Sequence, residues 1–182
     1  MRKYYSRTGD DGFTARLGQG RLPKYHRIIE AVGTIDEASS TLGMARAVCQ
    51  APGCTEILLT IQRDLYHIMA ELSASEDTVS HFQVIDDSSV IWLEKQIELL
   101  GDSIRMPRDF IVPGDSLAGA MIGLARTTIR RAERRVTQLL HENEVSNSHL
   151  VSYLNRLSSL CFVLELLELQ FKGLPDPTLA KS

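Results

Sequence analysis

The sequence predicts an all-α protein, a bundle of about five helices that follows an irregular, glycine-rich N-terminal loop. Apolar residues recur at helical spacing in five stretches after residue 26, and Gly and Pro fall mainly between those stretches. Apart from a possible short piece at Lys3–Tyr5, nothing shows a convincing strand period. With 182 residues, 43% of them hydrophobic, we expect one domain: a loop over 1–25, a bundle over 26–172 and a tail over 173–182.

The first 25 residues have no helical period and are rich in glycine. Glycine permits positive φ angles and close approach of the backbone to a ligand. The hydroxyls of Thr8 and Thr14 and the ammonium of Lys24 would complete a phosphate cradle. The segment matches neither the P-loop nor the dinucleotide fingerprint. A disordered or hairpin-forming N-terminus remains the alternative interpretation.

The first three helices are bounded by turn and capping residues. The first is expected over Arg27–Cys49 and ends before Pro52–Gly53. Apolar periodicity then predicts a second helix over Thr55–Ala74. After a polar stretch, Ser88 is the expected N-cap of a third helix that stops at Gly101.

The last two helices follow a rigid loop. Met106–Ser116 contains two prolines and cannot be helical throughout. Ser116 is the expected N-cap of a fourth helix over Leu117–His141, and a fifth is expected over about Ser148–Phe171.

The fourth helix carries five arginines within the stretch Ala125–Arg135. Projected at about 100° per residue, its apolar side chains fall on one arc. An adjoining arc, here called the arginine face, holds Arg126, Arg130, Glu133 and Arg134. Guanidinium groups bind phosphate and carboxylate, often bidentately. A solvated face with i,i+4 charge partners, or a surface that docks an acidic protein, is the alternative.

Composition narrows the classes of partner. A net charge of −3, from 20 basic and 23 acidic residues, argues against a general nucleic-acid surface and favours a compact anionic ligand. No apolar stretch is expected to be long enough to span a membrane. The three cysteines are an odd number without a CxxC motif, so we expect reduced thiols in a cytoplasmic protein. Metal ligation by Cys49 and Cys54 is the less favoured alternative.

Other residues admit more than one interpretation. Asp64 and His67 have i,i+3 spacing but lack the further carboxylates that a bundle metal site needs, so no metal held by the protein is expected. Asp36 is either an exposed helix residue or the partner of an arginine. Phe110 is either a core anchor or a ligand contact. Asn155 shares one face of the last helix with Ser159 and Phe162, where it faces solvent or binds a ligand.

Three segments together resemble the PduO-type ATP:cob(I)alamin adenosyltransferases. They are RTGDDGFTARLGQGRLPK with VGTIDE, FIVPGDS through ARTTIRRAERR, and YLNRLSSLCFVL. The resemblance implies a five-helix bundle that assembles as a homotrimer with sites between adjacent subunits. It implies transfer of the 5′-deoxyadenosyl group of ATP to cob(I)alamin, with Mg²⁺ on the nucleotide and triphosphate as the other product. It also implies a cob(II)alamin reductase and an adenosylcobalamin-dependent enzyme as partners.

The resemblance assigns roles to particular positions. Arg130 and Arg134 correspond to arginines that hold ATP from the neighbouring subunit, with Glu133 between them, and Asn155 corresponds to the asparagine that contacts ATP. Asp36 and Arg126 correspond to an ion pair across the interface, and Phe110 to the aromatic residue beneath the corrin; Phe162 is also assigned to cofactor binding. The catalytic set is thus Asp36, Phe110, Arg126 and Arg130. The triphosphate site in the N-terminal loop would comprise Ser6, Arg7, Thr8, Gly9, Thr14, Ala15 and Lys24.

The chain departs from the family pattern at three positions. Asp115 stands where the family commonly has Gly, Gly123 where it commonly has His, and Ser159 where it usually has Asp. The last change removes a carboxylate near the expected corrin and nucleotide sites. A nucleotide-binding sensor or cobalamin carrier that turns over poorly is therefore an alternative to an enzyme.

Overall fold

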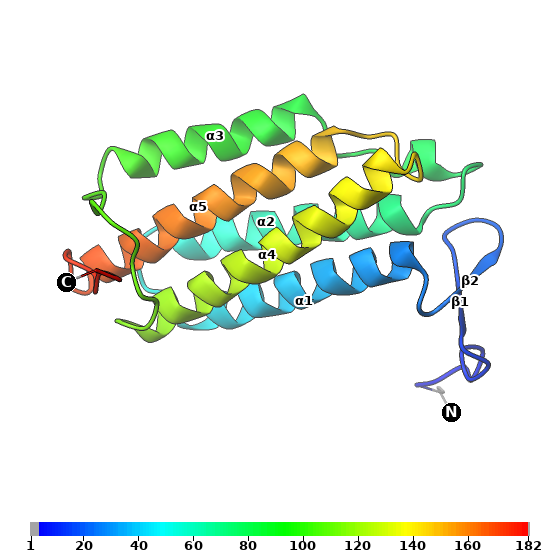
Figure 1. Ribbon diagram of the computed structural model, residues 1–182, viewed down its shortest axis with the longest axis horizontal. Coiled ribbons are helices and arrows are strands. Elements are labelled where there is room, and N and C mark those ends of the chain that lie inside the picture. The colour runs from blue at the N-terminus through cyan, green and yellow to red at the C-terminus, as the bar shows by residue number, and fades with distance from the viewer. Residues whose placement is uncertain (1–3, 182) are drawn as a thin grey trace.

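Five helices enclose one core in the computed structural model, which describes residues 4–181 (Figure 1). α4 packs against α1 and α5, α1 packs against α2, and α3 packs against α5. The prediction of an all-α bundle is confirmed. The helices are α1 (Arg27–Val48), α2 (Cys54–Ser73), α3 (Asp87–Gly101), α4 (Leu117–His141) and α5 (His149–Phe171), with a 3₁₀ turn at Val79–His81 between α2 and α3.

The core lies between α1, α2, α4 and α5, whose inward residues are almost completely buried. Long aliphatic side chains such as Ile35, Leu65 and Ile129 fill most of it. Tyr153 is the one aromatic among the largest fully buried side chains, and its hydroxyl donates a hydrogen bond to Asp64 at 2.7 Å. Asp64 itself is half-buried, and this burial raises the pKa of its carboxyl group.

α5 is the most apolar helix. By length and composition it could cross a membrane, so the expectation that no stretch reaches this length is wrong. However, 61% of its apolar window is buried inside the bundle. The hydrophobicity of α5 therefore fits its position as a core helix packed between α3 and α4.

Capping residues fix where α3 and α4 begin. Ser116 accepts a hydrogen bond from Gly119 N at 3.0 Å, which confirms the predicted cap of α4. The predicted cap of α3 is wrong. Asp86, rather than Ser88, accepts from the Ser89 backbone amide, and the Ser88 hydroxyl donates to Asp86 instead. A carboxylate at this position also interacts favourably with the helix dipole.

A small antiparallel hairpin lies within the glycine-rich loop, in agreement with the alternative interpretation of a hairpin-forming N-terminus. β1 (Phe13–Ala15) pairs with β2 (Arg21–Pro23), whereas Tyr4–Tyr5 form no strand and Lys3 lies outside the described residues. Backbone hydrogen bonds between Leu17 and the end of α2 attach the hairpin to the bundle. Gly18, at φ 117°, passes so close to that junction that an added Cβ would lie 2.0 Å from Ser75 Oγ. Only glycine fits there.

Candidate functional site

The N-terminal loop surrounds a cavity of about 980 Å³, here called the loop cavity. All seven loop residues that the resemblance assigned to triphosphate binding line it, together with two aspartates, a phenylalanine and a second arginine. They gather there although the loop lacks regular structure apart from the hairpin. The lining comprises Ser6, Arg7, Thr8, Gly9, Asp10, Asp11, Phe13, Thr14, Ala15, Arg21 and Lys24.

Internal contacts hold the loop in shape. Arg21 donates to both oxygens of Asp11 at 2.8 Å, and this pairing lowers the pKa of Asp11. Arg7 has a left-handed backbone with φ 63°, which is uncommon for a residue with a side chain and is often found at functional sites. Gly9 admits Lys24, since a Cβ on Gly9 would lie 3.0 Å from the lysine Nζ. The ammonium is thereby brought against the glycine backbone.

A second hollow, the Phe110 cleft, lies between α4, α5 and the 106–111 segment. It has a volume of about 600 Å³ and contains Phe110, Arg126, Arg130, Ser159 and Phe162 among its lining residues. The Phe110 side chain is 83% exposed, so its interpretation as a core anchor is wrong. An exposed aromatic ring, a second aromatic and three arginines, Arg108 among them, therefore share one cleft.

The arginines of α4 form two groups that point in different directions, as the helical projection predicted. Arg131 and Arg135 form ion pairs with Glu37 and Glu30 on α1. Within residues 4–181, by contrast, neither Arg130 nor Arg134 forms an ion pair or a hydrogen bond, and both are exposed.

The acidic member of the arginine face has a partner on α5. Glu133 Oε1 accepts a hydrogen bond from Asn155 Nδ2 at 2.9 Å, which joins two residues assigned to ATP. Asp36 is exposed on α1, and within residues 4–181 it forms neither a hydrogen bond nor an ion pair with Arg126. The pairing assigned to Asp36 and Arg126 thus remains an expectation about two subunits.

Sequence reasoning missed a buried carboxylate behind the Phe110 cleft. Glu165 is 2% exposed, and burial raises its pKa to about 7, an effect that nearby Arg126 opposes. Gly123 makes room for it, because a Cβ there would lie 3.2 Å from both carboxylate oxygens. The glycine at position 123 is thus accompanied by an acid in the adjacent space. Cys161 lies nearby and is no nucleophile, since burial raises its pKa to about 12.

The buried Glu165 predicts a loss of stability as pH rises. In the folded protein its pKa is about 7, above the ordinary value of 4.5. The free-energy cost of ionising the buried carboxyl group is therefore absent below pH 4.5 and complete above pH 7. At ~1.4 kcal/mol per pKa unit, the penalty is about 3 kcal/mol. Glu165→Gln should therefore stabilise the protein more at pH 8 than at pH 5 by up to that amount. Denaturant unfolding at both values measures this, with the exposed Glu98→Gln as control. An equal effect of Glu165→Gln at both pH values would contradict the prediction.

Asp115, another departure from the family pattern, fastens the C-terminal tail. Its two carboxylate oxygens accept from the Thr178 amide and hydroxyl, each at 2.8 Å. The tail then runs beside the cleft loop, where Ala180 N donates to Phe110 O at 2.7 Å and Val112 N donates to Thr178 O at 2.8 Å. The tail is therefore a backbone partner of the segment that carries Phe110.

The model of the cobalamin adenosyltransferase family matches residues 4–168, a range that includes both hollows. The chain belongs to this family. Its similarity to members extends over most of the bundle. The corrinoid adenosyltransferase PduO of Citrobacter freundii is 37% identical over 162 residues, 88% of this chain and 48% of the relative. The corrinoid adenosyltransferase of Bacillus subtilis is 36% identical over 164 residues, 88% of this chain and 83% of the relative.

The structure of this adenosyltransferase-family chain is also similar to solved structures. One is a phenylalanine-to-alanine variant of a PduO-type ATP:corrinoid adenosyltransferase from Lactobacillus reuteri, complexed with cobalamin and ATP. It superposes with a TM-score of 0.90 at 26% identity and covers 99% of this chain and 100% of that chain. The present chain therefore spans about half the length of the Citrobacter relative but the whole of this structural neighbour.

Proposed function

We propose that this adenosyltransferase-family protein transfers the 5′-deoxyadenosyl group of ATP to cob(I)alamin. The single observation that carries the proposal concerns two guanidinium groups that have no partner among residues 4–181: Arg130 lines the apolar cleft that presents Phe110, and Arg134 lies one turn further along α4. The guanidinium groups would stabilise an anionic leaving group, and the apolar cleft with its exposed aromatic ring would bind a flat macrocycle. Relatives at 36–37% identity are named corrinoid adenosyltransferases, which supports the same reaction.

The proposed step is a displacement at the 5′ carbon of ATP. The electron pair of Co(I) forms the new Co–C bond while the C–O bond to the phosphate chain breaks, so cobalt becomes Co(III) and triphosphate leaves. No side chain has to act as nucleophile, so the step needs no catalytic triad. The protein contributes position and electrostatic stabilisation of the leaving group.

The residues that would stabilise triphosphate come from both hollows. Lys24, Arg7 and the backbone amides of the loop would bind phosphate oxygens, and Arg130 and Arg134 would bind them from the other side. Mg²⁺ would accompany the nucleotide. The hydroxyls of Thr8 and Thr14, together with the carboxylates of the loop cavity, are the oxygen donors that suit such a hard cation.

We infer that a complete site needs two subunits. None of the hydrogen bonds or ion pairs found for loop residues 4–24 involves α4; the loop instead contacts the end of α2 and the segment after it. Within one chain, the loop cavity and the arginine face are therefore separate. A homotrimer in which the loop of one subunit meets α4 of the next, with Asp36 paired to Arg126 across the contact, would unite them.

Subunit complementation tests this arrangement. Lys24→Ala disables the loop side and Arg130→Ala the helix side, so each variant alone should be nearly inactive. After joint denaturation and refolding of an equal mixture, random assortment leaves about one quarter of the sites with both intact halves. The refolded mixture should therefore show roughly one quarter of the wild-type activity. A mixture that stays inactive while the wild type, treated alike, regains activity would place both halves in one subunit.

The direct test of activity is anaerobic incubation of the protein with MgATP and chemically reduced cobalamin. Appearance of the adenosylcobalamin spectrum over many turnovers is the expected result. The replacement of Asp by Ser at position 159 favours one alternative, a nucleotide-binding sensor or cobalamin carrier. That alternative predicts MgATP binding and at most a single turnover, so the number of product molecules per site separates the two functions.

The reaction needs a supply of Co(I), so a cob(II)alamin reductase is a proposed partner, and an adenosylcobalamin-dependent enzyme is the proposed recipient of the product. All three cysteines are free thiols in the structure. Free thiols suit the reducing cytoplasm, which is the compartment we propose.

A further inference from the structure

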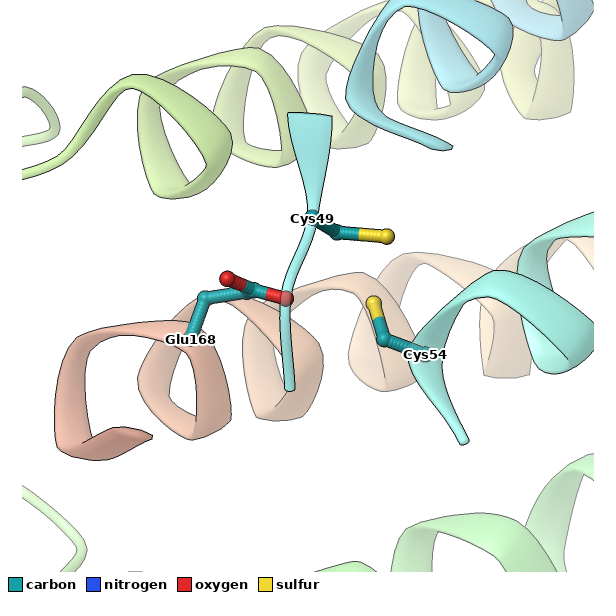
Figure 2. Close-up of side chains that lie close together, drawn as sticks. All are labelled: Cys49, Cys54 and Glu168. Atoms are coloured by element: carbon teal, nitrogen blue, oxygen red, sulfur yellow. The ribbon is translucent and has the colours of Figure 1, made fainter. Parts of the chain in front are cut away.

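Two cysteines and a glutamate meet where the α1–α2 connection crosses the end of α5 (Figure 2). Cys49 is the residue that follows α1, Cys54 is the first residue of α2, and Glu168 lies in the last turn of α5. Their sulfur and oxygen atoms all lie within 4.8 Å of one another. Of the groups of three or more His, Cys, Asp and Glu in residues 4–181, this one alone has such spacing.

Glu168 has one satisfied oxygen and one unsatisfied oxygen. Oε1 accepts from the backbone amides of Gln50 and Ala51, both at 2.8 Å. Oε2 is buried and has no hydrogen-bond partner, although the residue is 0% exposed. A buried carboxylate oxygen without a partner is costly, and a bound cation would remove that cost.

We propose that Cys49, Cys54 and Glu168 bind one Zn²⁺ ion. Thiolate and carboxylate are both zinc ligands, and three protein ligands plus water complete a tetrahedral shell. Zinc bond lengths of ~2.0–2.3 Å place neighbouring ligand atoms roughly 3.5–3.8 Å apart, so the present spacing needs only a small contraction. Cys49 is half-buried, which leaves an entry side open to solvent.

The same geometry favours a metal over a disulfide. Both thiols are free, and a bond between Cys49 and Cys54 would leave Glu168 Oε2 without a partner, whereas zinc would engage all three groups. The ion would fasten the α1–α2 connection to α5, with water in its fourth coordination position. The site lies at the end of the bundle opposite the hairpin (Figure 1). Zinc there would not act on the nucleotide bound by the loop.

Cobalt substitution tests the site without ATP or cobalamin, so its outcome is independent of the proposed function. The reduced full-length protein, freed of metal with a chelator, is titrated with Co²⁺ and then with Zn²⁺. One Co²⁺ per chain should bind with a thiolate-to-cobalt charge-transfer band, and Zn²⁺ should abolish the band. The absence of such a band in the folded, reduced protein would overturn the proposal.

Variants assign the ligands. Cys49→Ser changes a half-buried side chain and should remove most of the charge-transfer intensity. Glu168→Gln keeps an acceptor for the Gln50 and Ala51 amides but should weaken Zn²⁺ binding at least ~10-fold. Cys161→Ala is the matched control, because it removes the remaining cysteine, which is buried on the same helix as Glu168, and should leave the band unchanged. Binding that survives both ligand substitutions, or that is lost only in the control, would show that the ion binds elsewhere and refute the assignment. Circular dichroism checks that each variant is folded.

Discussion

Arg130→Ala is expected to reduce adenosyl transfer by roughly 10²–10³-fold, the loss typical when one donor to a developing negative charge is removed. Arg130 lines the Phe110 cleft, is exposed and has no partner within residues 4–181. Its removal should therefore leave the free energy of unfolding within about 0.5 kcal/mol of wild type. Turnover with MgATP and cob(I)alamin, paired with a denaturant unfolding curve, measures both quantities.

The neighbouring residue provides the control for this prediction. Arg131 lies on the same helix but points away from the cleft and pairs with Glu37 on α1. Arg131→Ala removes the same charge at the cost of an exposed ion pair, worth at most about 1 kcal/mol. It should retain most of the activity. Equal losses in Arg130→Ala and Arg131→Ala would point to net charge as the cause and exclude a specific contact with the leaving group.

Helical periodicity was sufficient to predict the direction of each arginine. It separated Arg131 and Arg135 from the arginine face, and the structure directs both to α1. Capping chemistry similarly predicted Ser116, since its hydroxyl lies within reach of an amide three residues away. Both inferences depend on residues close in sequence, where helix geometry fixes the distances.

Contacts between segments that are distant in sequence could not be predicted from helical periodicity or capping. Glu165 and Glu168 stand in an apolar stretch of α5, and their positions on buried faces were a signal that went unused. Even so, their partners lie on other elements: Glu168 meets the α1–α2 connection and Glu165 fills the space left by Gly123. The pairing of Asp115 with the tail is equally distant in sequence. A projection of one helix contains no information on these packing partners.

Phe110→Ala is expected to lower turnover by about a hundredfold, equivalent to ~2.7 kcal/mol in the activation barrier, while ATP still binds. The ring is 83% exposed, so its loss creates no core cavity and should change the melting temperature little. The backbone around it is held by Asp109, whose Oδ1 accepts from Phe110 N at 2.8 Å, and by the tail. The side chain is thus presented by a fixed segment without supporting that segment.

The proposed task of this ring is to occupy the lower face of the corrin, where it excludes an axial ligand and makes Co(II) easier to reduce. Bound cob(II)alamin with MgATP should then give a four-coordinate electronic spectrum in the wild type and a five-coordinate one in Phe110→Ala. Val112→Ala is the matched control, since Val112 is a half-exposed apolar residue of the same loop outside the cleft. It should keep the wild-type spectrum. A Phe110→Ala protein that still shows four-coordinate cobalt would remove the proposed role from Phe110, because an alanine methyl group is too small to shield the metal. A five-coordinate spectrum in both variants would instead show that the loop as a whole, rather than the ring, controls access to cobalt.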